Sequence, residues 1–193
     1  MNPKISIILS TYNEAYFIEK TLNAIFDNLK EVEVIIVDDS STDDTCKKIK
    51  NFNDPRIKLF VRKRRGLASA FLLGLINTKG EIVGWFDSNM PELFKKTPQM
   101  ISELEKNELV ILSRYVSGGK DERSSLRVLS SKILNMLCRI ILGDDIRDYT
   151  SSIFLMKREQ LKHAVPICYG HGEFFIEFLF KLKESGIKVI EIP

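Results

Sequence analysis

The sequence lacks the patterns that mark several familiar classes of protein. Its 193 residues include only three cysteines, which are widely spaced and never arranged as Cys-x-x-Cys. Neither a disulfide framework nor a cysteine zinc site is therefore expected. The two histidines, His163 and His171, stand outside any motif, so no catalytic histidine is indicated. The chain also has no apolar run near the roughly 18 residues that predict a membrane span.

The first ten residues, "MNPKISIILS", lead directly into a β-type run. They show no succession of basic, apolar and small residues of the kind that forms a signal peptide. Together with the sparse cysteines, this start predicts a cytoplasmic protein in a reducing compartment.

Three motifs of well-known α/β enzymes are also missing. No Gly-x-Gly-x-x-Gly follows the first β-type run, and no Gly-x-x-x-x-Gly-Lys-Ser/Thr occurs anywhere. These absences disfavour a dinucleotide-dependent dehydrogenase and a P-loop ATPase. The lack of a Gly-x-Ser-x-Gly elbow disfavours an α/β-hydrolase. A net charge of only +3 gives no indication of nucleic-acid binding.

The residues that are present suit one α/β domain. Hydrophobic residues make up 44% of the chain and charged residues 28%, as in an ordinary globular domain. Short runs rich in Val and Ile alternate with helical stretches, which predicts a mostly parallel sheet flanked by helices. The expected strands are 4–10, 32–38, 57–61, 81–87, 108–113, 151–157 and 187–193. The expected helices are 11–29, 66–78, 124–143 and 173–186, together with a helix of about ten residues that begins after Thr45.

Polar residues follow four of the expected strands where each strand ends. They are Thr-Tyr-Asn-Glu at 11–14, Asp-Asp-Ser-Ser at 38–41, Asp-Ser-Asn at 87–89 and Ser-Arg-Tyr at 113–115. In an open α/β sheet, ligands bind beyond the carboxyl ends of the strands. One such stretch could simply cap a helix. Four in succession predict a shared ligand-binding crevice.

Five stretches together point to a known family. They are "SIILSTYNE", "IIVDDSSTDDT", "GLASAF", "ILSRYVSGGK" and "DYTSS", in this order along the chain. The sequence resembles the family 2 glycosyltransferases of the GT-A fold, and within them the polyprenyl-phosphate sugar transferases such as dolichyl-phosphate mannose synthases. The resemblance extends over nearly the whole chain. It implies one GT-A domain, with residues 1–113 as the nucleotide-sugar half and residues 114–193 as the acceptor half.

The resemblance implies a nucleotide-binding role for Thr11, Tyr12, Glu14 and Asp39, around the base and the ribose. Glu14 has a second interpretation, as an early acidic residue that favours the helix dipole. The basic run at 62–65 would usually be a solvated surface, although its place beside the crevice also suits contact with a diphosphate or an anionic membrane.

The resemblance further implies that Asp87 is catalytic and binds Mg²⁺ or Mn²⁺ at the donor diphosphate. Residues two apart in a strand face the same way, so Asp87 and Asn89 can share one ion. The family usually has a second aspartate where this chain has Asn89. An amide oxygen is an acceptable ligand for a hard cation but brings no charge, so weaker metal binding is expected. Pro91 is a further departure, since a polar residue often assists the metal there.

The resemblance assigns Arg114 to catalysis and, with Arg127 and Ser131, to the acceptor phosphate. Arg127 and Ser131 are four residues apart and share one face of a helix. A phosphate monoester has a second pKa of about 6, so it would attack without a general base. The apolar stripe within residues 126–141 is expected first as core and second as a surface that contacts a membrane.

The implied activity is inverting transfer of a sugar from GDP-mannose or a UDP-sugar to polyprenyl or dolichyl phosphate at the inner face of a membrane. One alternative keeps the reaction and changes the acceptor to a glycan or a small molecule. The other is a nucleotide-sugar-binding protein with weak or no activity because of Asn89. The sequence identifies neither the sugar nor the oligomeric state.

Overall fold

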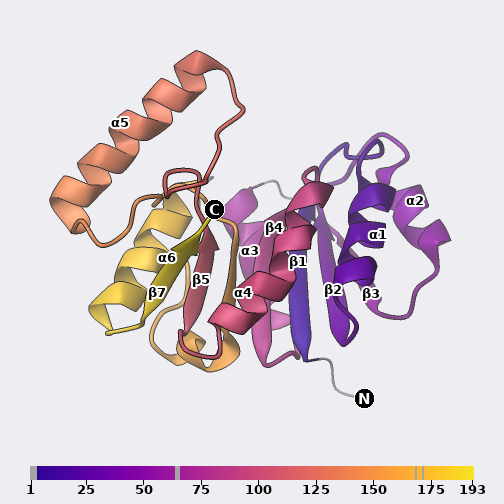
Figure 1. The fold of residues 1–193 in the computed structure, drawn as a ribbon. Helices are drawn as coiled ribbons and strands as arrows, with labels where there is room; N and C mark the ends of the chain where they lie inside the picture. The colour runs from indigo at the N-terminus through magenta and orange to yellow at the C-terminus, as the bar shows by residue number, and fades with distance from the viewer. Residues whose placement is uncertain (1–3, 64–65, 168, 171) are drawn as a thin grey trace.

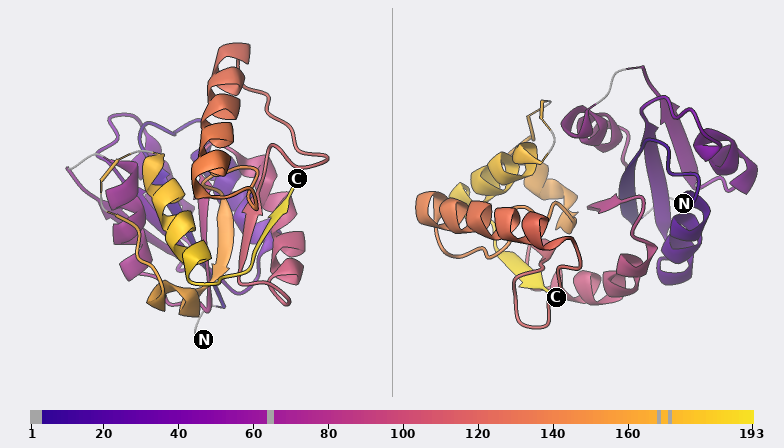
Figure 2. Two further views of the ribbon diagram at one scale, coloured as in Figure 1. Left: turned by 90° about the vertical axis from the view of Figure 1, so that its left-hand side faces the viewer. Right: turned by 90° about the horizontal axis from the view of Figure 1, so that it is seen from above.

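The computed structural model describes residues 4–63, 66–167, 169–170 and 172–193. Four residues considered above, Arg64, Arg65, Cys168 and His171, lie outside the described residues. The described chain forms a seven-stranded sheet in the order β3-β2-β1-β4-β6-β5-β7, with helices on both faces (Figures 1 and 2). The strands are β1 (Ile5–Thr11), β2 (Val32–Asp38), β3 (Ile57–Val61), β4 (Ile82–Asp87), β5 (Leu109–Leu112), β6 (Phe154–Lys157) and β7 (Val189–Ile192). The helices are α1 (Ile18–Asn28), α2 (Thr45–Phe52), α3 (Leu67–Ile76), α4 (Thr97–Glu103), α5 (Ser125–Leu142) and α6 (Glu173–Glu184), with 3₁₀ helices η1 (Pro91–Lys96) and η2 (Arg158–Lys162).

The sheet is parallel except at one strand. β1 pairs in parallel with β2 and β4, and β5 pairs in parallel with β7. β6 lies between β4 and β5 and runs antiparallel to both. This architecture confirms the expected α/β class, a mostly parallel GT-A sheet. It also brings the carboxyl ends of β1, β2, β4 and β5 to the same edge.

Two apolar layers hold the helices to the sheet. On one face, Phe71 of α3 and Phe178 of α6 pack with Trp85 of β4, and all three side chains are fully buried. On the other face, Ile18 of α1 and Met100 of α4 pack against the opposite side of the strands. The burial of Trp85 confirms its expected place in the core. A sheet covered on both faces explains why its strands are nearly continuous runs of Val and Ile.

The expected core role of the apolar stripe on α5 is wrong. Figure 1 shows α5 leaning out from the body of the molecule, above α6. Asn135 and Cys138 are the only buried residues of this helix. The stripe itself is exposed, by 75% at Leu126, 55% at Leu129, 48% at Ile133, 45% at Leu137 and 73% at Ile140. A helical period identifies which residues share a face, but it does not identify what covers them.

None of the helices in the described part of the chain is long and apolar enough to cross a membrane.

Candidate active site

A cavity of about 460 Å³ lies at the carboxyl ends of β1, β2 and β4. Its walls come from three strand ends and from the start of α3. The lining residues are Ser10, Thr11, Tyr12, Glu14, Asp39, Gly66, Leu67, Asp87, Ser88, Asn89 and Met90. Every residue predicted to bind the nucleotide or the metal is among them. The structure therefore brings these residues into one pocket, which we call the donor pocket.

The ends of β1 and β2 are locked together beneath this pocket. Thr11 is opposite Asp38 in the sheet, and its hydroxyl donates to the Asp38 carboxylate at 2.8 Å. The backbone N–H of Ser41 donates to the same carboxylate at 2.8 Å. Burial alone would raise the pKa of Asp38, but the hydrogen bonds from Ser41 and Thr11 lower it below its ordinary value. Asp38 therefore fixes the turn, while the next residue, Asp39, faces the pocket.

Asp39 is held by Arg62, a residue that the sequence indicated only as part of a basic run. Arg62 donates through Nε to Oδ1 and through Nη2 to Oδ2, the latter at 3.1 Å. The backbone N–H of Gly66 adds a hydrogen bond of 3.0 Å, and Arg62 also donates to the Gly66 carbonyl at 2.7 Å. Gly66 has a φ of 140°, a conformation that side chains rarely adopt. Arg62 and the backbone of Gly66 thus hold Asp39, and both Asp39 and Gly66 line the donor pocket.

Acidic side chains crowd the centre of the donor pocket. Burial raises the pKa of Asp87, and the positive charge of Arg114 offsets only part of this effect. Burial also raises the pKa of Glu14, and the charges of Asp87 and Asp43 raise it further. The amide of Asn89 lies 3.5 Å from the Glu14 carboxylate. Glu14 precedes α1 by several residues and faces the pocket, so its role is not that of a first-turn acid on the helix.

These residues fit a hard divalent cation. Carboxylate and amide oxygens are the ligands that Mg²⁺ and Mn²⁺ prefer. A cation beside Asp87 and Glu14 would favour the charged forms that burial disfavours. No group of three or more His, Cys, Asp or Glu side chains in the described ranges could hold a metal unaided.

The turn that carries Asn89 is held by two hydrogen bonds of Ser88. The Ser88 hydroxyl donates to the Ser10 carbonyl at 2.9 Å, and the Thr21 hydroxyl donates to the Ser88 carbonyl at 2.7 Å. Pro91 begins η1 directly afterwards and is not a lining residue of the donor pocket.

Arg114 lies between the donor pocket and a second cavity. It donates through Nε and Nη2 to the buried Asp148 carboxylate, at 2.8 and 2.7 Å, and through Nη2 to the Thr150 hydroxyl at 2.7 Å. Its Nη1 has no hydrogen bond to any residue that the structure describes. The charge of Arg114 still acts on Asp87 across the site.

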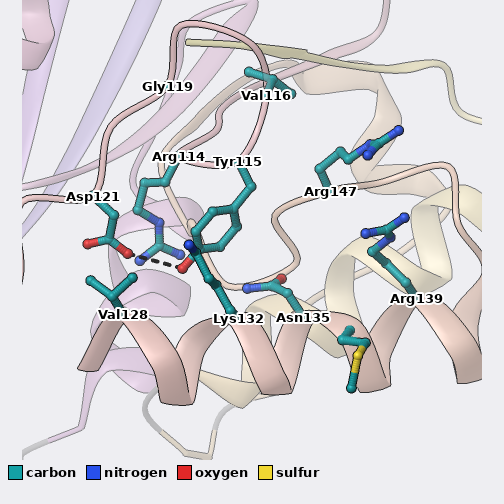
Figure 3. Close-up of a pocket in the computed structure, with 11 residues that line it drawn as sticks. Arg114, Tyr115, Val116, Gly119, Asp121, Val128, Lys132, Asn135, Arg139 and Arg147 are labelled. Carbon is teal, nitrogen blue, oxygen red and sulfur yellow. Dashed lines mark hydrogen bonds between the residues drawn. The ribbon is translucent and has the colours of Figure 1, made fainter. Parts of the chain in front are cut away.

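The second cavity, of about 500 Å³, lies between α5 and the loop that follows β5 (Figure 3). We call it the helix pocket. Arg114 lines it, whereas Arg127 and Ser131 do not. Arg127 is exposed, and the Ser131 hydroxyl lies 3.2 Å from that of Thr150. The three residues predicted for the acceptor phosphate are therefore not gathered in this pocket.

Three further cationic side chains line the helix pocket together with Arg114. Lys132 and Arg139 reach it from α5, and Arg147 from the segment after α5 (Figure 3). The sequence contained one signal for them, since Val128, Lys132, Asn135 and Arg139 recur at helical spacing. Arg147 could not be linked to them without the fold.

Known proteins with similar sequences are glycosyltransferases. Residues 6–164 match the family described as Glycosyl transferase family 2. A dolichol-phosphate mannosyltransferase from Pyrococcus furiosus is 32% identical over 198 residues, which cover 98% of this chain and 55% of the relative. An undecaprenyl-phosphate mannosyltransferase from Micrococcus luteus is 25% identical over 201 residues, with coverage of 98% and 82%. The chain thus spans about half the length of the first relative.

Solved structures with a similar fold are also glycosyltransferases. Glucosyl-3-phosphoglycerate synthase from Mycobacterium tuberculosis, in complex with Mn²⁺, UDP and glucosyl-3-phosphoglycerate, has a TM-score of 0.72 at 25% identity. The match covers 98% of this chain and 70% of that one. A mannosyltransferase from Pyrobaculum calidifontis, in complex with GDP-Man and Mn²⁺, has a TM-score of 0.69 at 21% identity. That match covers 100% of this chain and 55% of the other.

Proposed function

The chain belongs to glycosyl transferase family 2, and from that membership we propose that it transfers a sugar from a nucleotide-sugar to a polyprenyl phosphate. The observation that carries the proposal is the donor pocket, where three strand ends bring Asp39, Glu14, Asp87 and Asn89 together. Two relatives named as polyprenyl-phosphate mannosyltransferases each match 98% of the chain, which supports the acceptor. They also favour mannose as the sugar.

In the donor pocket, Thr11, Tyr12 and Asp39 would bind the base and ribose. Asp87 and Asn89, with Glu14 beside them, would hold Mg²⁺ or Mn²⁺. The bound cation supplies charge stabilisation for the diphosphate as it leaves. Mn²⁺ in two similar enzymes supports this assignment.

The acceptor phosphate would approach from the side of Arg114. A phosphate oxygen forms a bond to the anomeric carbon of the sugar, while the bond from that carbon to the diphosphate oxygen breaks. The nucleoside diphosphate leaves with the electron pair, and the configuration at the carbon is inverted. A dianionic phosphate has no proton to lose, so no side chain has to act as a base. The free Nη1 of Arg114 would hold the charge of the phosphate.

The positions of the lining residues along the sequence support a division of the domain into two halves. All residues that line the donor pocket precede residue 114, and all that line the helix pocket lie at 114 or beyond. We therefore propose residues 1–113 as the donor half and residues 114–193 as the acceptor half.

The exposed side chains of α5 support an acceptor with a lipid tail. Leu126, Ile140 and Ile141 are each more than 70% exposed. Such a surface suits contact with the inner face of a membrane, where a polyprenyl chain would emerge.

A phosphorylated small molecule is the second candidate acceptor. The structure of the synthase bound to glucosyl-3-phosphoglycerate favours it, because a related fold holds a small phosphorylated compound. Nucleotide binding without transfer remains the alternative that Asn89 would favour.

The test is a product assay by mass spectrometry with GDP-mannose and UDP-sugars, Mn²⁺, and either a short-chain polyprenyl phosphate or phosphoglycerate. Transfer to the lipid phosphate is expected. Transfer to phosphoglycerate alone would support the second candidate. Binding of the nucleotide-sugar without any product would leave only a binding function.

A further inference from the structure

The helix pocket has an excess of positive charge. Its cationic lining residues are Arg114, Lys132, Arg139 and Arg147, and its one acidic lining residue is Asp121. Tyr115 donates to Asp121 at 3.0 Å, and Arg123 donates to it at 2.7 Å. The pKa of Asp121 is held well below its ordinary value, first by the hydrogen bond from Arg123. The charge of this carboxylate is therefore already balanced by Arg123, and it does not offset the cations that line the pocket.

The four cationic side chains differ in whether a carboxylate already forms an ion pair with them. Arg114 is bound to buried Asp148, as described above, and Arg139 forms an ion pair with Asp144. That second pair is exposed to solvent, so it can be exchanged for a ligand at little cost. Lys132 has no ion pair or hydrogen bond through its side chain with any described residue.

Arg147 is fixed by its backbone rather than by its side chain. Its N–H donates to a Glu191 carboxylate oxygen at 2.7 Å, and the next N–H, of Asp148, donates to the other oxygen at 2.9 Å. These bonds tie the segment to β7. The guanidinium group of Arg147 makes no hydrogen bond within the described ranges and acts on Asp144 only at longer range. Two cations of the pocket, Lys132 and Arg147, are thus available to a ligand.

The base of the pocket also has an unused hydrogen-bond acceptor. Asn135 is 3% exposed and donates through Nδ2 to the Ser131 carbonyl at 2.9 Å and the Thr150 hydroxyl at 2.8 Å. Its Oδ1 is buried and receives no hydrogen bond from the described chain. Figure 3 shows Asn135 on α5 between Lys132 and Arg139. An unpaired buried carbonyl is costly, so a hydrogen-bond donor at this position, such as a water molecule bound with a ligand, would be favoured.

We propose that the helix pocket binds a phosphate monoester through Lys132, Arg139 and Arg147. Phosphate oxygens suit a cavity lined by three cations, and arginine pairs with phosphate through two parallel hydrogen bonds. A water molecule bound beside the dianionic phosphate could donate to the Asn135 carbonyl. A neutral glycan would leave the charges of Lys132 and Arg147 without a partner. A carboxylate would offer fewer oxygens to them.

This inference rests on the proposed function, because it gives the acceptor phosphate a site in the acceptor half. It also changes the residues involved. Arg127 and Ser131 lie outside the pocket, so the main contacts pass to the three cations that line it. Arg114 lines the helix pocket, and its positive charge also lowers the pKa of Asp87 in part, which connects the phosphate site with the donor pocket. Met136 and Val128 add an apolar wall along which a hydrocarbon tail could leave.

The test is isothermal titration calorimetry of the full chain with a short-chain prenyl phosphate, the matching prenyl alcohol, and inorganic phosphate. Lys132→Ala and Arg147→Ala are each expected to weaken binding of the prenyl phosphate by roughly tenfold or more, because each removes a charge-assisted contact. Lys106→Ala is the matched control. Lys106 is an exposed residue between α4 and β5, at the opposite end of β5 from the pocket, and its loss should leave binding unchanged.

Comparison of the ligands identifies the source of the phosphate. A prenyl phosphate that binds far better than inorganic phosphate, with no binding of the alcohol, supports a lipid acceptor in this pocket. Similar affinities for both phosphates support a pocket for free or small-molecule phosphate. In either case the two alanine variants must lose affinity.

Two results would overturn the inference. One is unchanged affinity in Lys132→Ala and Arg147→Ala together with lost affinity in Arg127→Ala, which would return the site to Arg127 and Ser131. The other is no phosphate binding at all. Thermal shifts with GDP or UDP and Mn²⁺, measured on the same samples, separate this failure from that of the proposed function. A nucleotide shift without phosphate binding rejects the helix pocket alone.

Discussion

Arg114 and Asp148 form a two-pronged ion pair that joins the end of β5 to the segment before β6. The Nε–Oδ2 and Nη2–Oδ1 distances are 2.8 and 2.7 Å, and the backbone N–H of Arg114 adds a bond of 3.0 Å to Oδ2. Asp148 is fully buried, and only 21% of the Arg114 side chain is exposed. An arginine held in this way is restricted in orientation, which leaves its Nη1 without a bond to any described residue and free for a ligand.

Replacement of Asp148 by asparagine is expected to destabilise the fold and impair acceptor use. The change leaves the half-buried charge of Arg114 without its partner, which should lower the free energy of unfolding by about 3 kcal/mol. The KM for the acceptor should rise while the affinity for the nucleotide is unchanged. Urea denaturation and steady-state kinetics measure the two effects. Asp144→Asn removes the exposed pair with Arg139 and should barely change the unfolding free energy. Equal effects of both variants would contradict the special role of the buried pair.

The metal proposal gives opposite expectations for two neighbouring positions. Asp87→Asn removes the only carboxylate of the Asp87–Asn89 pair, and transfer should fall by roughly a hundredfold or more, since a cation at a leaving group contributes several kcal/mol. Asn89→Asp adds a charge beside the ion and should lower the Mn²⁺ concentration needed for half-maximal activity. A Mn²⁺ titration of transfer measures both. Asp27→Asn, at an exposed position of α1, is the control. Normal turnover of Asp87→Asn would place the metal elsewhere.

Much of the fold and of the donor pocket could be predicted from sequence because both depend on local order. Val- and Ile-rich runs define β1, β2 and β4, and a strand that ends in a polar residue places that residue at the carboxyl edge of the sheet. Thr11, Asp39 and Asp87 were therefore predicted together before any contact was known. The short η1 and α4 were not predicted, since residues 91–103 lack a clear period.

The acceptor side could not be predicted equally well because its partners are distant in sequence. β6 runs antiparallel between β4 and β5, an arrangement that pairs Trp85 with Phe154 and that no local pattern encodes. One pair of the donor pocket was unpredictable for the same reason, since Arg62 and Asp39 form an ion pair across 23 residues of sequence. Arg114 was predicted to contact phosphate. Asp148 belongs to the quoted stretch "DYTSS", but its ion pair with Arg114, 34 residues away in sequence, was not predicted. The apolar period of α5 was correctly recognised, but it indicated burial where the structure has exposure.

The raised pKa values of Asp87 and Glu14 give the protein without metal a specific pH dependence. Burial is the main cause of both shifts, so the folded state favours the protonated forms. A carboxyl group with a raised pKa contributes stability below its unfolded pKa and loses it as the pH rises through the folded pKa. The melting temperature without metal should thus fall, on account of these groups, between the ordinary carboxyl range and the raised values.

Divalent cations should reverse this trend, because they bind the charged forms. The stabilisation by Mn²⁺, measured as the rise in melting temperature, should therefore increase from acidic to neutral pH. In Asp87→Asn the protein without metal should melt at a higher temperature at neutral pH than the wild type, and the gain from Mn²⁺ should be small. Thermal unfolding across a pH series tests both statements. A Mn²⁺ effect that is independent of pH would exclude these carboxylates as ligands.

The exposed apolar surface of α5 should determine binding to membranes. Leu126 and Ile140 lie near opposite ends of the helix and are 75% and 73% exposed, so neither contributes much to the core. Burial of one such side chain in a lipid surface is worth roughly 1.5–3 kcal/mol. Replacement of both by serine should therefore weaken binding to vesicles that contain anionic lipids by at least about a hundredfold, while the unfolding free energy stays almost unchanged. Vesicle sedimentation and urea denaturation measure the two quantities.

Ile76→Ser is the matched control, because Ile76 is 69% exposed at the end of α3 and is not part of α5. If the double variant sediments with vesicles as well as the wild type does, α5 does not contact the lipid. If it loses vesicle binding and still transfers sugar to a short-chain polyprenyl phosphate in solution, then Leu126 and Ile140 bring the enzyme to the membrane and the phosphate contacts do not depend on them.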